Sequence, residues 1–201
     1  MNTRQKEESL TLEILQTIEE HNDVTQRHLA DNLGVALGLA NSYLKRCVKK
    51  GLIKIHQAPA NRYFYYLTPK GFAEKSRLTA EYLTSSFDFY RKAGHSVSEL
   101  FAECEKRGWR RIAFCGISEL AEIASLRAHD HDLEHVMTLD NGPMTGRYLG
   151  KPLHHGYNEQ AGVDAYLVTS LTDAAGVVEQ LAGSVPKERI LVPSILGLNR
   201  H

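Results

Sequence analysis

A tight turn between two helical patterns is the feature of this sequence that most restricts its fold. The turn is Asn32-Leu33-Gly34-Val35, in which Gly34 can adopt the positive φ angle that such a turn requires. Residues 25–33 before it carry leucines four positions apart, and Thr25 can cap this short helix. Residues 36–50 after it form a longer helical pattern that a glycine ends. The inward stripe of the longer helix is expected to be Ala40, Leu44, Cys47 and Val48.

Elements on both sides of this helix pair complete a recognisable order. Residues 9–21 repeat apolar positions at helical spacing, and Ser9 can cap their helix. Residues 52–56 alternate as a half-buried strand does, and residues 62–67 are aromatic and β-prone, with a turn-forming loop between the two. A further helix is expected over residues 68–92, with threonine as its cap and proline at its first position. Three helices followed by a hairpin indicate a winged helix-turn-helix.

The formal net charge of zero hides a basic block. Between Ala36 and Arg77 there are nine basic residues and one acidic residue, a local charge of +8. Residues 93–201 hold ten basic and fourteen acidic residues, a net charge of −4. A basic block in a neutral chain is typical of a face that binds a polyanion. The alternatives are a solvated charged surface and a winged helix that contacts another protein.

In the DNA-binding interpretation, the helix after the turn enters the major groove of double-stranded DNA. Its side opposite the apolar stripe then meets base edges, and its basic residues neutralise phosphates. Near the tip of the hairpin, further residues meet the flanking backbone or the minor groove. The expected DNA-binding residues are Gly38, Leu39, Asn41, Ser42, Lys45, Arg46, Lys49, Asn61 and Arg62.

Two stretches, TQRHLADNLGVALGLANSYLKRCVKKGLIKI and YLTPKGFAEKSRLTAEYL, resemble the small MarR-type winged-helix regulators associated with bacterial exopolysaccharide gene clusters. The resemblance covers roughly residues 9–90. It implies a homodimer in which the long helix after the wing supplies part of the interface. Two positions depart from the pattern of this group. Ala36 stands where a capping serine or threonine is usual, and Leu39 stands where a polar or basic residue is common.

The second half of the chain has a different periodicity. Short apolar runs alternate with helical stretches of 10 to 13 residues, which indicates a parallel sheet with helices on its faces. The stretch between residues 141 and 162 is expected to be irregular. The predicted fold is therefore an α+β winged helix-turn-helix over residues 1–92, followed by a small α/β Rossmann-like parallel-sheet domain over residues 93–201. The expected strands are 111–115, 134–140, 164–169 and 189–192, and the expected helices are 96–107, 119–129 and 172–181.

Polar residues at the ends of these strands are the candidate ligand-binding residues. Parallel strands present their carboxyl ends, and the helix that follows the first strand, to a ligand. Only one glycine stands at the first strand-to-helix turn, and Glu119 beside it would repel a pyrophosphate, so the dinucleotide fingerprint is not met. The candidate residues are Gly116, Ser118, Asp140, Thr169 and Ser170.

The order of these elements resembles a Rossmann-like half-domain found in sugar-modifying acyltransferases and some sugar methyltransferases. In those relatives the domain binds nucleotide-linked sugars or related cofactors, which implies a nucleotide sugar as a possible effector here. Three roles stay open for the domain: a small-molecule sensor, a dimerising scaffold, and an enzyme of nucleotide-sugar metabolism with an appended DNA-binding module.

Other features narrow the expected function. The three cysteines form no CxxC pair, which fits a reducing compartment, and no signal peptide or membrane span is apparent. The histidines of AHDHDLEH are expected in a solvated connection rather than a metal site, and no hydrolase signature is present. We therefore expect a cytoplasmic DNA-binding transcriptional regulator of bacterial surface or exopolysaccharide genes. No catalytic residue, metal or cofactor is expected, and the chain is not expected to be an enzyme.

Overall fold

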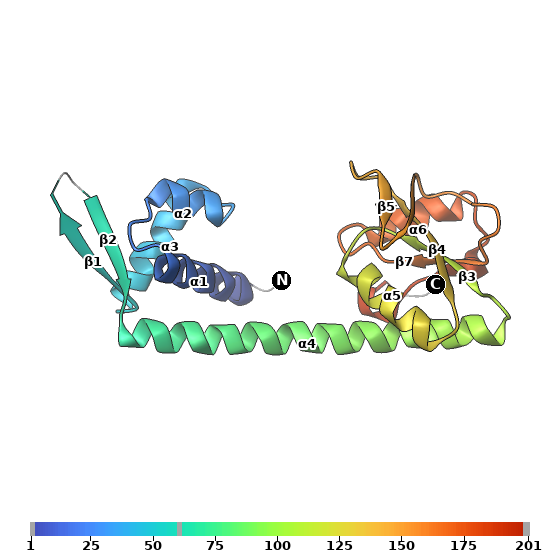
Figure 1. Ribbon diagram of the computed structural model, residues 1–201, viewed down its shortest axis with the longest axis horizontal. Helices are drawn as coiled ribbons and strands as arrows, with labels where there is room; N and C mark the ends of the chain where they lie inside the picture. Colours follow the sequence, from blue (N-terminus) through green and yellow to red (C-terminus); the bar gives the residue numbers. More distant parts are fainter. Residues whose placement is uncertain (1–2, 60–61, 199–201) are drawn as a thin grey trace. The chain divides into compact units, whose positions relative to one another are not determined.

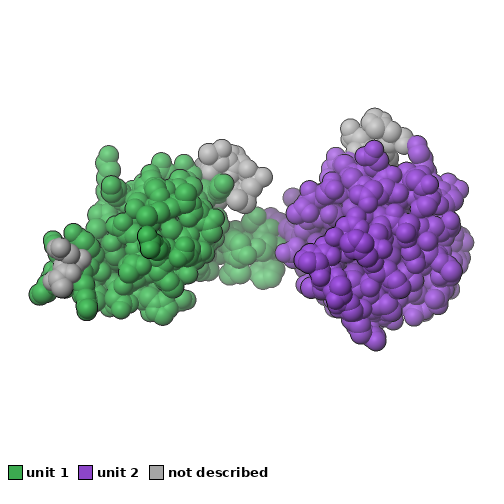
Figure 2. All heavy atoms as spheres, turned by 90° about the horizontal axis from the view of Figure 1, so that it is seen from above, with its two compact units in different colours: residues 1–87 green, residues 88–201 purple. Residues whose placement is uncertain are grey.

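The computed structural model of the protein describes residues 3–59 and 62–198. The chain divides into two compact units, residues 1–87 and residues 88–201, shown separately coloured in Figure 2. The expected division at residue 92 falls five residues later, inside the same helix. No described helix combines the length and the apolar character needed to cross a bilayer.

The first unit contains three helices, a hairpin and the beginning of a long helix (Figure 1). Leucine, isoleucine and valine side chains from the three helices, with Tyr65 of the hairpin and Leu78 of the long helix, form a single buried core. The two strands pair antiparallel, with Ile53 opposite Leu67 and Ala58 opposite Arg62. The elements are α1 (Thr3–Glu20), α2 (Gln26–Asn32), α3 (Leu37–Lys49), β1 (Ile53–Ala58), β2 (Arg62–Leu67) and α4 (Pro69–Lys106).

The starts of α2 and α3 agree with the sequence patterns, whereas the start of α1 differs. Thr25 caps α2, since its side-chain oxygen accepts a hydrogen bond from the backbone N–H of His28 at 3.2 Å. Helix α1 begins before Ser9, whose hydroxyl reaches the side chain of Glu13 instead of capping the helix. Helix α3 begins after Ala36, which supplies no side-chain cap.

The LTPKG segment joins the hairpin to α4 and also hydrogen-bonds to the residues that follow the end of α3. The Thr68 hydroxyl donates to the carbonyl oxygen of Gly51 at 2.7 Å and accepts from the backbone N–H of Gly71 at 3.0 Å. Gly71 is buried, and a Cβ atom there would overlap the carbonyl oxygen of Leu52. A glycine is therefore required where α4 passes over the start of the hairpin.

Helix α4 is continuous, so the expectation of two helices, 68–92 and 96–107, is wrong. The predicted break rested on Gly94, which lies inside the helix and is buried. A Cβ atom at Gly94 would come within 2.9 Å of Nε of Arg127. The glycine thus makes room for a neighbouring helix and does not end its own.

The second unit is built around a six-stranded sheet in the order β5-β6-β4-β3-β7-β8. All neighbouring pairs are parallel except β5 with β6. The expected α/β domain with a mainly parallel sheet is therefore confirmed. Its elements after α4 are β3 (Arg111–Cys115), α5 (Glu119–Asp130), β4 (Glu134–Asp140), β5 (Gly146–Tyr148), β6 (Lys151–His155), β7 (Ala165–Val168), α6 (Ala174–Ala182), β8 (Ile190–Leu191) and the short 3-10 helices Lys187–Arg189 and Ser194–Leu196.

The stretch expected to be irregular holds two of these strands. β5 and β6 form a hairpin whose turn places Leu149 and Gly150 at φ angles of 49° and 73°. A paired positive-φ turn matches the right-handed twist of a hairpin. The strands were missed because each is short and carries no apolar alternation, since β6 has only one apolar residue besides its proline.

The two faces of the sheet are covered by different helices. Phe114 and Leu167 point to one face, where they join a buried cluster with the end of α4 and with α5. Cys115 and Tyr166 point to the other face, where they pack with α6. This alternation explains why the central strands read as continuous apolar runs in the sequence.

Candidate nucleic-acid interface

The outward face of α3 is polar and basic. Ala40, Leu44 and Cys47 are buried against the core of the first unit. Because an α-helix repeats every 3.6 residues, the opposite face carries a second set of residues. That set is exposed and consists of Gly38, Ser42, Lys45 and Lys49.

The other residues expected to meet DNA lie in different surroundings. Leu39 is exposed, whereas Asn41 is half-buried. The amide oxygen of Asn41 is buried and accepts no hydrogen bond from the part of the chain that the structure describes. Arg62 is exposed at the start of β2. Asn61 lies outside the described residues.

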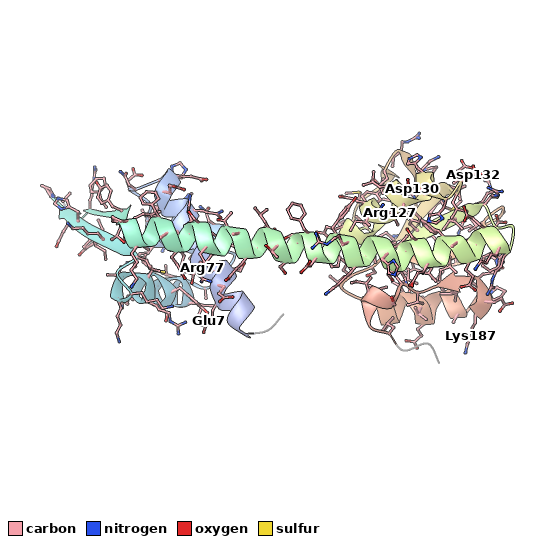
Figure 3. The ribbon with its side chains drawn as sticks, turned by 90° about the horizontal axis from the view of Figure 1, so that it is seen from below. Glu7, Arg77, Arg127, Asp130, Asp132 and Lys187 are labelled. Atoms are coloured by element: carbon pink, nitrogen blue, oxygen red, sulfur yellow. The ribbon has the colours of Figure 1, made fainter. Side chains whose placement is uncertain are left out.

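Arg46 is directed toward α1 and not along the outward face of α3. Its guanidinium lies 3.0 Å from the carboxylate of Glu7, which Figure 3 labels, and 5.4 Å from the ring centre of Tyr43. Both partners of the ion pair are partly solvated, so the pair contributes little to stability. The pair nevertheless holds a cation that was expected from the sequence to neutralise a DNA phosphate.

Three further cations of the basic block are held by groups of the fold itself. Their partners are a helix-end carbonyl and three carboxylates. Lys70 donates to the carbonyl oxygen of Lys50 at 2.9 Å, Lys75 pairs with Glu19, and Arg77 pairs with Glu74 and Glu81.

The remaining five cations of the block make no ion pair within residues 3–59 and 62–198. All five are exposed and belong to α3, to the residue after it, or to the hairpin. The fold thus divides the +8 block into an internally paired group and an outward group. The outward group is Lys45, Lys49, Lys50, Lys54 and Arg62.

One small unit thus contains two helices joined by a tight turn. It also carries an exposed basic face on the second of these helices and a basic hairpin. Residues 8–54 match the family described as winged helix-turn-helix DNA-binding. The winged helix-turn-helix expected at the N-terminus is therefore confirmed. The match covers under a quarter of the chain and leaves the second unit unassigned.

Solved structures resemble the chain only distantly. A MarR family transcription regulator shares 21% identity, with 48% of this chain and 73% of that chain covered and a TM-score of 0.34. An O-methyltransferase from neocarzinostatin biosynthesis, solved with S-adenosylmethionine, shares 15% identity over 94% of this chain and 78% of its own, with a TM-score of 0.41. Human N-acetylserotonin methyltransferase shares 14% identity over 94% and 74%, with a TM-score of 0.36. No curated protein matches the chain significantly.

One expectation needs correction here. The chain was not expected to be an enzyme, yet several of the similar structures that extend over most of its length are O-methyltransferases. That finding contradicts the expectation, which is withdrawn. A likeness at this level of identity and TM-score assigns no reaction, substrate or cofactor to the chain.

In the second unit, the five candidate ligand-binding residues come together at the carboxyl edge of the sheet. The Thr169 hydroxyl donates to the carbonyl oxygen of Gly116 at 2.5 Å, and the Ser118 hydroxyl donates to that of Thr169 at 2.5 Å. Gly116 has a φ angle of +111°, and a Cβ atom there would lie 2.5 Å from the backbone nitrogen of Ser170. The ends of β3 and β7 are therefore in direct contact.

Asp140, at the end of β4, is bound inward. One carboxylate oxygen accepts from the backbone N–H of Ile117 at 3.1 Å and from the hydroxyl of Tyr157 at 3.2 Å. The other accepts from the backbone N–H of Gly142 at 2.7 Å. Burial and the neighbouring carboxylate raise the pKa of Tyr157, which keeps it a neutral donor. Tyr148 also reaches this edge, where its hydroxyl donates to the carbonyl oxygen of Ser118 at 3.1 Å. Neither tyrosine was among the candidate residues from the sequence, where nothing distinguishes them from core residues.

The helix start at this edge is acidic. Ser118 caps α5 by accepting hydrogen bonds from the backbone N–H groups of Leu120 and Ala121. Glu119 and Glu122 lie in the first turn, where they compete with any anion for the positive end of the helix. The edge is therefore poorly suited to a diphosphate.

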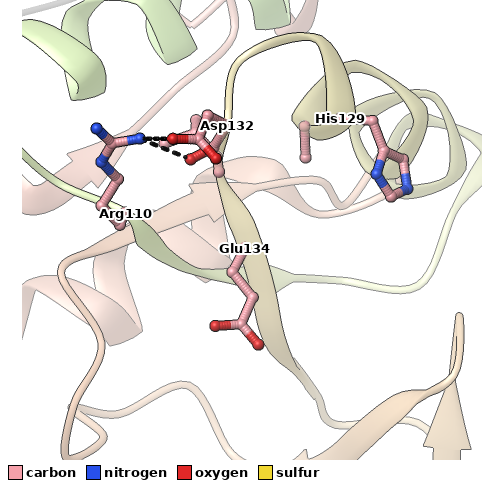
Figure 4. Close-up of a pocket in the computed structure, with 6 residues that line it drawn as sticks. Arg110, His129, Asp132 and Glu134 are labelled. Carbon is pink, nitrogen blue, oxygen red and sulfur yellow. Dashed lines mark hydrogen bonds and ion pairs between the residues drawn. The ribbon is translucent and has the colours of Figure 1, made fainter.

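An open hollow of about 390 Å³ lies at the opposite end of the sheet, between the end of α5 and the start of β4. Figure 4 shows Arg110 paired with Asp132 on one side of it, with His129 and Glu134 nearby. All four are exposed. The sequence-predicted ligand residues do not line this hollow.

Burial keeps the three cysteine thiols protonated and His135 neutral. Burial raises the pKa of the Cys47 thiol to about 11 and that of Cys104 to about 12, and it also raises the pKa of Cys115. Burial lowers the pKa of His135 to about 4. The His135 ring stacks on Phe114 with ring centres 4.0 Å apart, as expected of a neutral core residue.

Proposed function

We propose that this protein is a DNA-binding transcription regulator that places α3 in the major groove and the β1–β2 hairpin against the flanking backbone. The observation that carries the proposal is the division of the basic block. Three of its cations are in ion pairs within the fold and a fourth, Lys70, donates to a backbone carbonyl, whereas five exposed cations on α3 and the hairpin make no ion pair in the described chain. Phosphates are the partners that such a face recruits, and a winged helix presents it to a duplex.

The test compares two changes of equal charge in the full-length protein. Lys45→Gln with Lys49→Gln removes two cations from the outward face. Arg77→Gln with Lys75→Gln removes two cations that are paired internally. Binding of a fluorescent duplex from the DNA upstream of the gene is measured by anisotropy across a salt series.

The proposal predicts that the first variant lowers affinity and reduces the slope of log K against log salt by about 1.8, because each phosphate contact contributes about 0.9. The second variant should leave the slope unchanged. Equal effects of the two variants would mean that only net charge matters. Binding no tighter than to unrelated DNA, with no salt slope, would instead mean that the winged helix contacts a protein.

We propose further that the regulator is a homodimer joined through α4. Residues 80–88 are all exposed, and they include Tyr82 and Phe87 with 61% and 58% of their surface accessible. Large apolar side chains spaced along an exposed helix favour pairing with a second helix. A two-fold dimer presents two copies of α3 to two half-sites, which is how helix-turn-helix proteins gain affinity.

The carboxyl edge of the sheet is our proposed effector site. The sheet order supports it, because the chain leaves β3 toward β4 on one side and returns to β7 on the other, and ligands of α/β sheets bind where the strand order reverses. The acidic first turn of α5 favours an uncharged or cationic ligand over a nucleotide sugar. Thermal unfolding with a uridine diphosphate sugar, and with the free sugar, tests this preference. A larger shift with the diphosphate would contradict it.

Two finer expectations stay predictions: control of exopolysaccharide or other surface genes, and a cytoplasmic location. Transcript levels after deletion of the gene test the first, and fractionation of cells tests the second. The nucleotide-sugar effector expected from the sequence is the alternative that the thermal shifts above compare with an uncharged ligand.

A further inference from the structure

The first turn of α3 exposes apolar surface at the place where a recognition helix enters DNA. Leu37 and Leu39 have 44% and 42% of their surface accessible. Gly38 stands between them, and nothing lies within 4 Å of a Cβ atom built on it. Because successive helical residues are about 100° apart, the two leucines flank the glycine on opposite sides. We call these three residues the leucine notch.

Folding of the first unit does not account for the leucine notch. Gly38 is helical, so no positive φ angle demands a glycine, and no close neighbour in the described chain demands one either. Alanine has a higher helix propensity than glycine, so helix formation does not select glycine at this position. Ala36 provides no side-chain cap that would offset the lower propensity of glycine. The space beside Gly38 is therefore open to a partner outside the described chain.

The charges beside the leucine notch indicate what that partner is. Ser42, Lys45 and Lys49 continue the outward face of α3 beyond Gly38. A purely apolar protein partner would leave these cations facing it unpaired, whereas a duplex pairs them with phosphates. In helix-turn-helix complexes the N-terminal residues of the recognition helix contact base edges. The leucine notch then faces the floor of the major groove.

Only one base presents an apolar group in the major groove, and that is thymine with its 5-methyl group. A leucine side chain donates and accepts no hydrogen bond, so Leu37 and Leu39 cannot read guanine, adenine or cytosine edges as arginine or asparagine would. We propose that the leucine notch selects thymine by packing Leu37 and Leu39 against 5-methyl groups, while Gly38 allows the helix to approach closely. This inference rests on the DNA-binding function proposed above and assigns its base preference.

The experiment begins with sequences that the full-length protein selects from a random 30-base-pair library. The best duplex is then synthesised with uracil in place of thymine, one position at a time, which removes a methyl group and no hydrogen-bonding group. At the one or two contacted positions in each half-site we expect about a four-fold loss of affinity, the change that corresponds to about 0.8 kcal/mol for one buried methyl-sized group.

The protein variants supply the matched controls. Leu37→Ala with Leu39→Ala should bind the thymine and uracil duplexes equally, because no apolar contact remains to lose. Leu39→Met should keep the preference for thymine, since its side chain is also apolar. Leu126→Ala changes an exposed leucine of α5, 58% accessible, and should behave as the unchanged protein. Far-ultraviolet circular dichroism checks that α3 is retained.

The outcomes separate this inference from the function beneath it. An enriched site that is bound tightly and equally with uracil would overturn the leucine notch as a thymine reader and leave the regulator proposal standing. The same holds if binding is tight and salt-dependent but no sequence is enriched. Failure to bind any duplex would overturn both, and the exposed leucines would then belong to a protein interface.

Discussion

The guanidinium of Arg46 lies 3.0 Å from the carboxylate of Glu7, and this contact joins the C-terminal half of α3 to α1. Lys45, its neighbour in sequence, has no ion-pair partner in the described residues. Two adjacent cations on one helix therefore have different surroundings, and sequence spacing alone does not distinguish them.

DNA binding should separate these two cations. Arg46→Gln is expected to change affinity for a duplex by less than about two-fold, because its guanidinium is directed toward Glu7 on α1, and losing an exposed ion pair worth at most about 1 kcal/mol should not unfold α3. Lys45→Gln should weaken binding several-fold at low salt and lower the salt slope by about 0.9. Anisotropy titrations at two salt concentrations measure both. A larger loss with Arg46→Gln would mean that the Glu7 pair opens on DNA.

Two helical glycines should respond oppositely to alanine. Gly71→Ala forces a Cβ atom into the carbonyl oxygen of Leu52, and such overpacking costs about 1 to 3 kcal/mol or more. Gly38→Ala meets no atom within 4 Å and gains helix propensity, so stability should rise by up to about 1 kcal/mol. Urea unfolding followed by circular dichroism measures both changes. Similar values for the two variants would contradict the close approach at Gly71.

The buried His135 should make stability depend on pH. Burial lowers the pKa of its imidazole from 6.5 to about 4, so the unfolded chain takes up a proton at a higher pH than the folded chain does. The stability linked to His135 is therefore present above pH 6.5 and is lost as pH falls toward 4, by up to about 3 kcal/mol.

His135→Gln removes this titration. Its free energy of unfolding should fall less steeply between pH 6.5 and pH 4 than that of the unchanged protein, whatever its absolute stability. Denaturant unfolding at half-unit pH steps gives the two slopes. Parallel slopes would show that His135 titrates near its ordinary pKa.

The exposed apolar side chains of α4 should decide the oligomeric state. Leu83→Asp with Phe87→Asp is expected to raise the dimer dissociation constant more than ten-fold, because burying each such side chain contributes about 1.5 to 3 kcal/mol. Leu126→Asp, at an exposed position of α5, serves as the control. Analytical ultracentrifugation over a concentration series distinguishes them. A monomer before any substitution, or a dimer unaffected by the change, would overturn the proposed α4 interface.

Local chemistry determined much of the fold from sequence alone. The apolar spacing of residues 36–50 predicted α3, and the β-prone run RYFYYL predicted β2, each within a few residues of the observed bounds. Thr25 caps its helix as expected because a cap needs only groups three residues apart. The apolar runs of β3 and β7 likewise reflect burial on both faces, which is visible in composition.

Expectations that depended on residues distant in the sequence were wrong more often. Gly94 reads as a helix end in sequence, whereas it is a contact point for Arg127, thirty-three positions away. The β5–β6 hairpin has no alternation of its own and depends on the edge offered by β4. Only tertiary structure could supply these partners.

The same distinction applies to the candidate sites. The amino-acid sequence by itself determined that a basic block accompanies a helix-turn-helix, because charge and spacing are properties of neighbouring residues. Tertiary structure decided which cations face outward, since Glu7 and Glu19 reach Arg46 and Lys75 from α1. It also turned Asp140 inward onto the turn after β3, because hydrogen bonds between strand ends form only when the sheet has assembled.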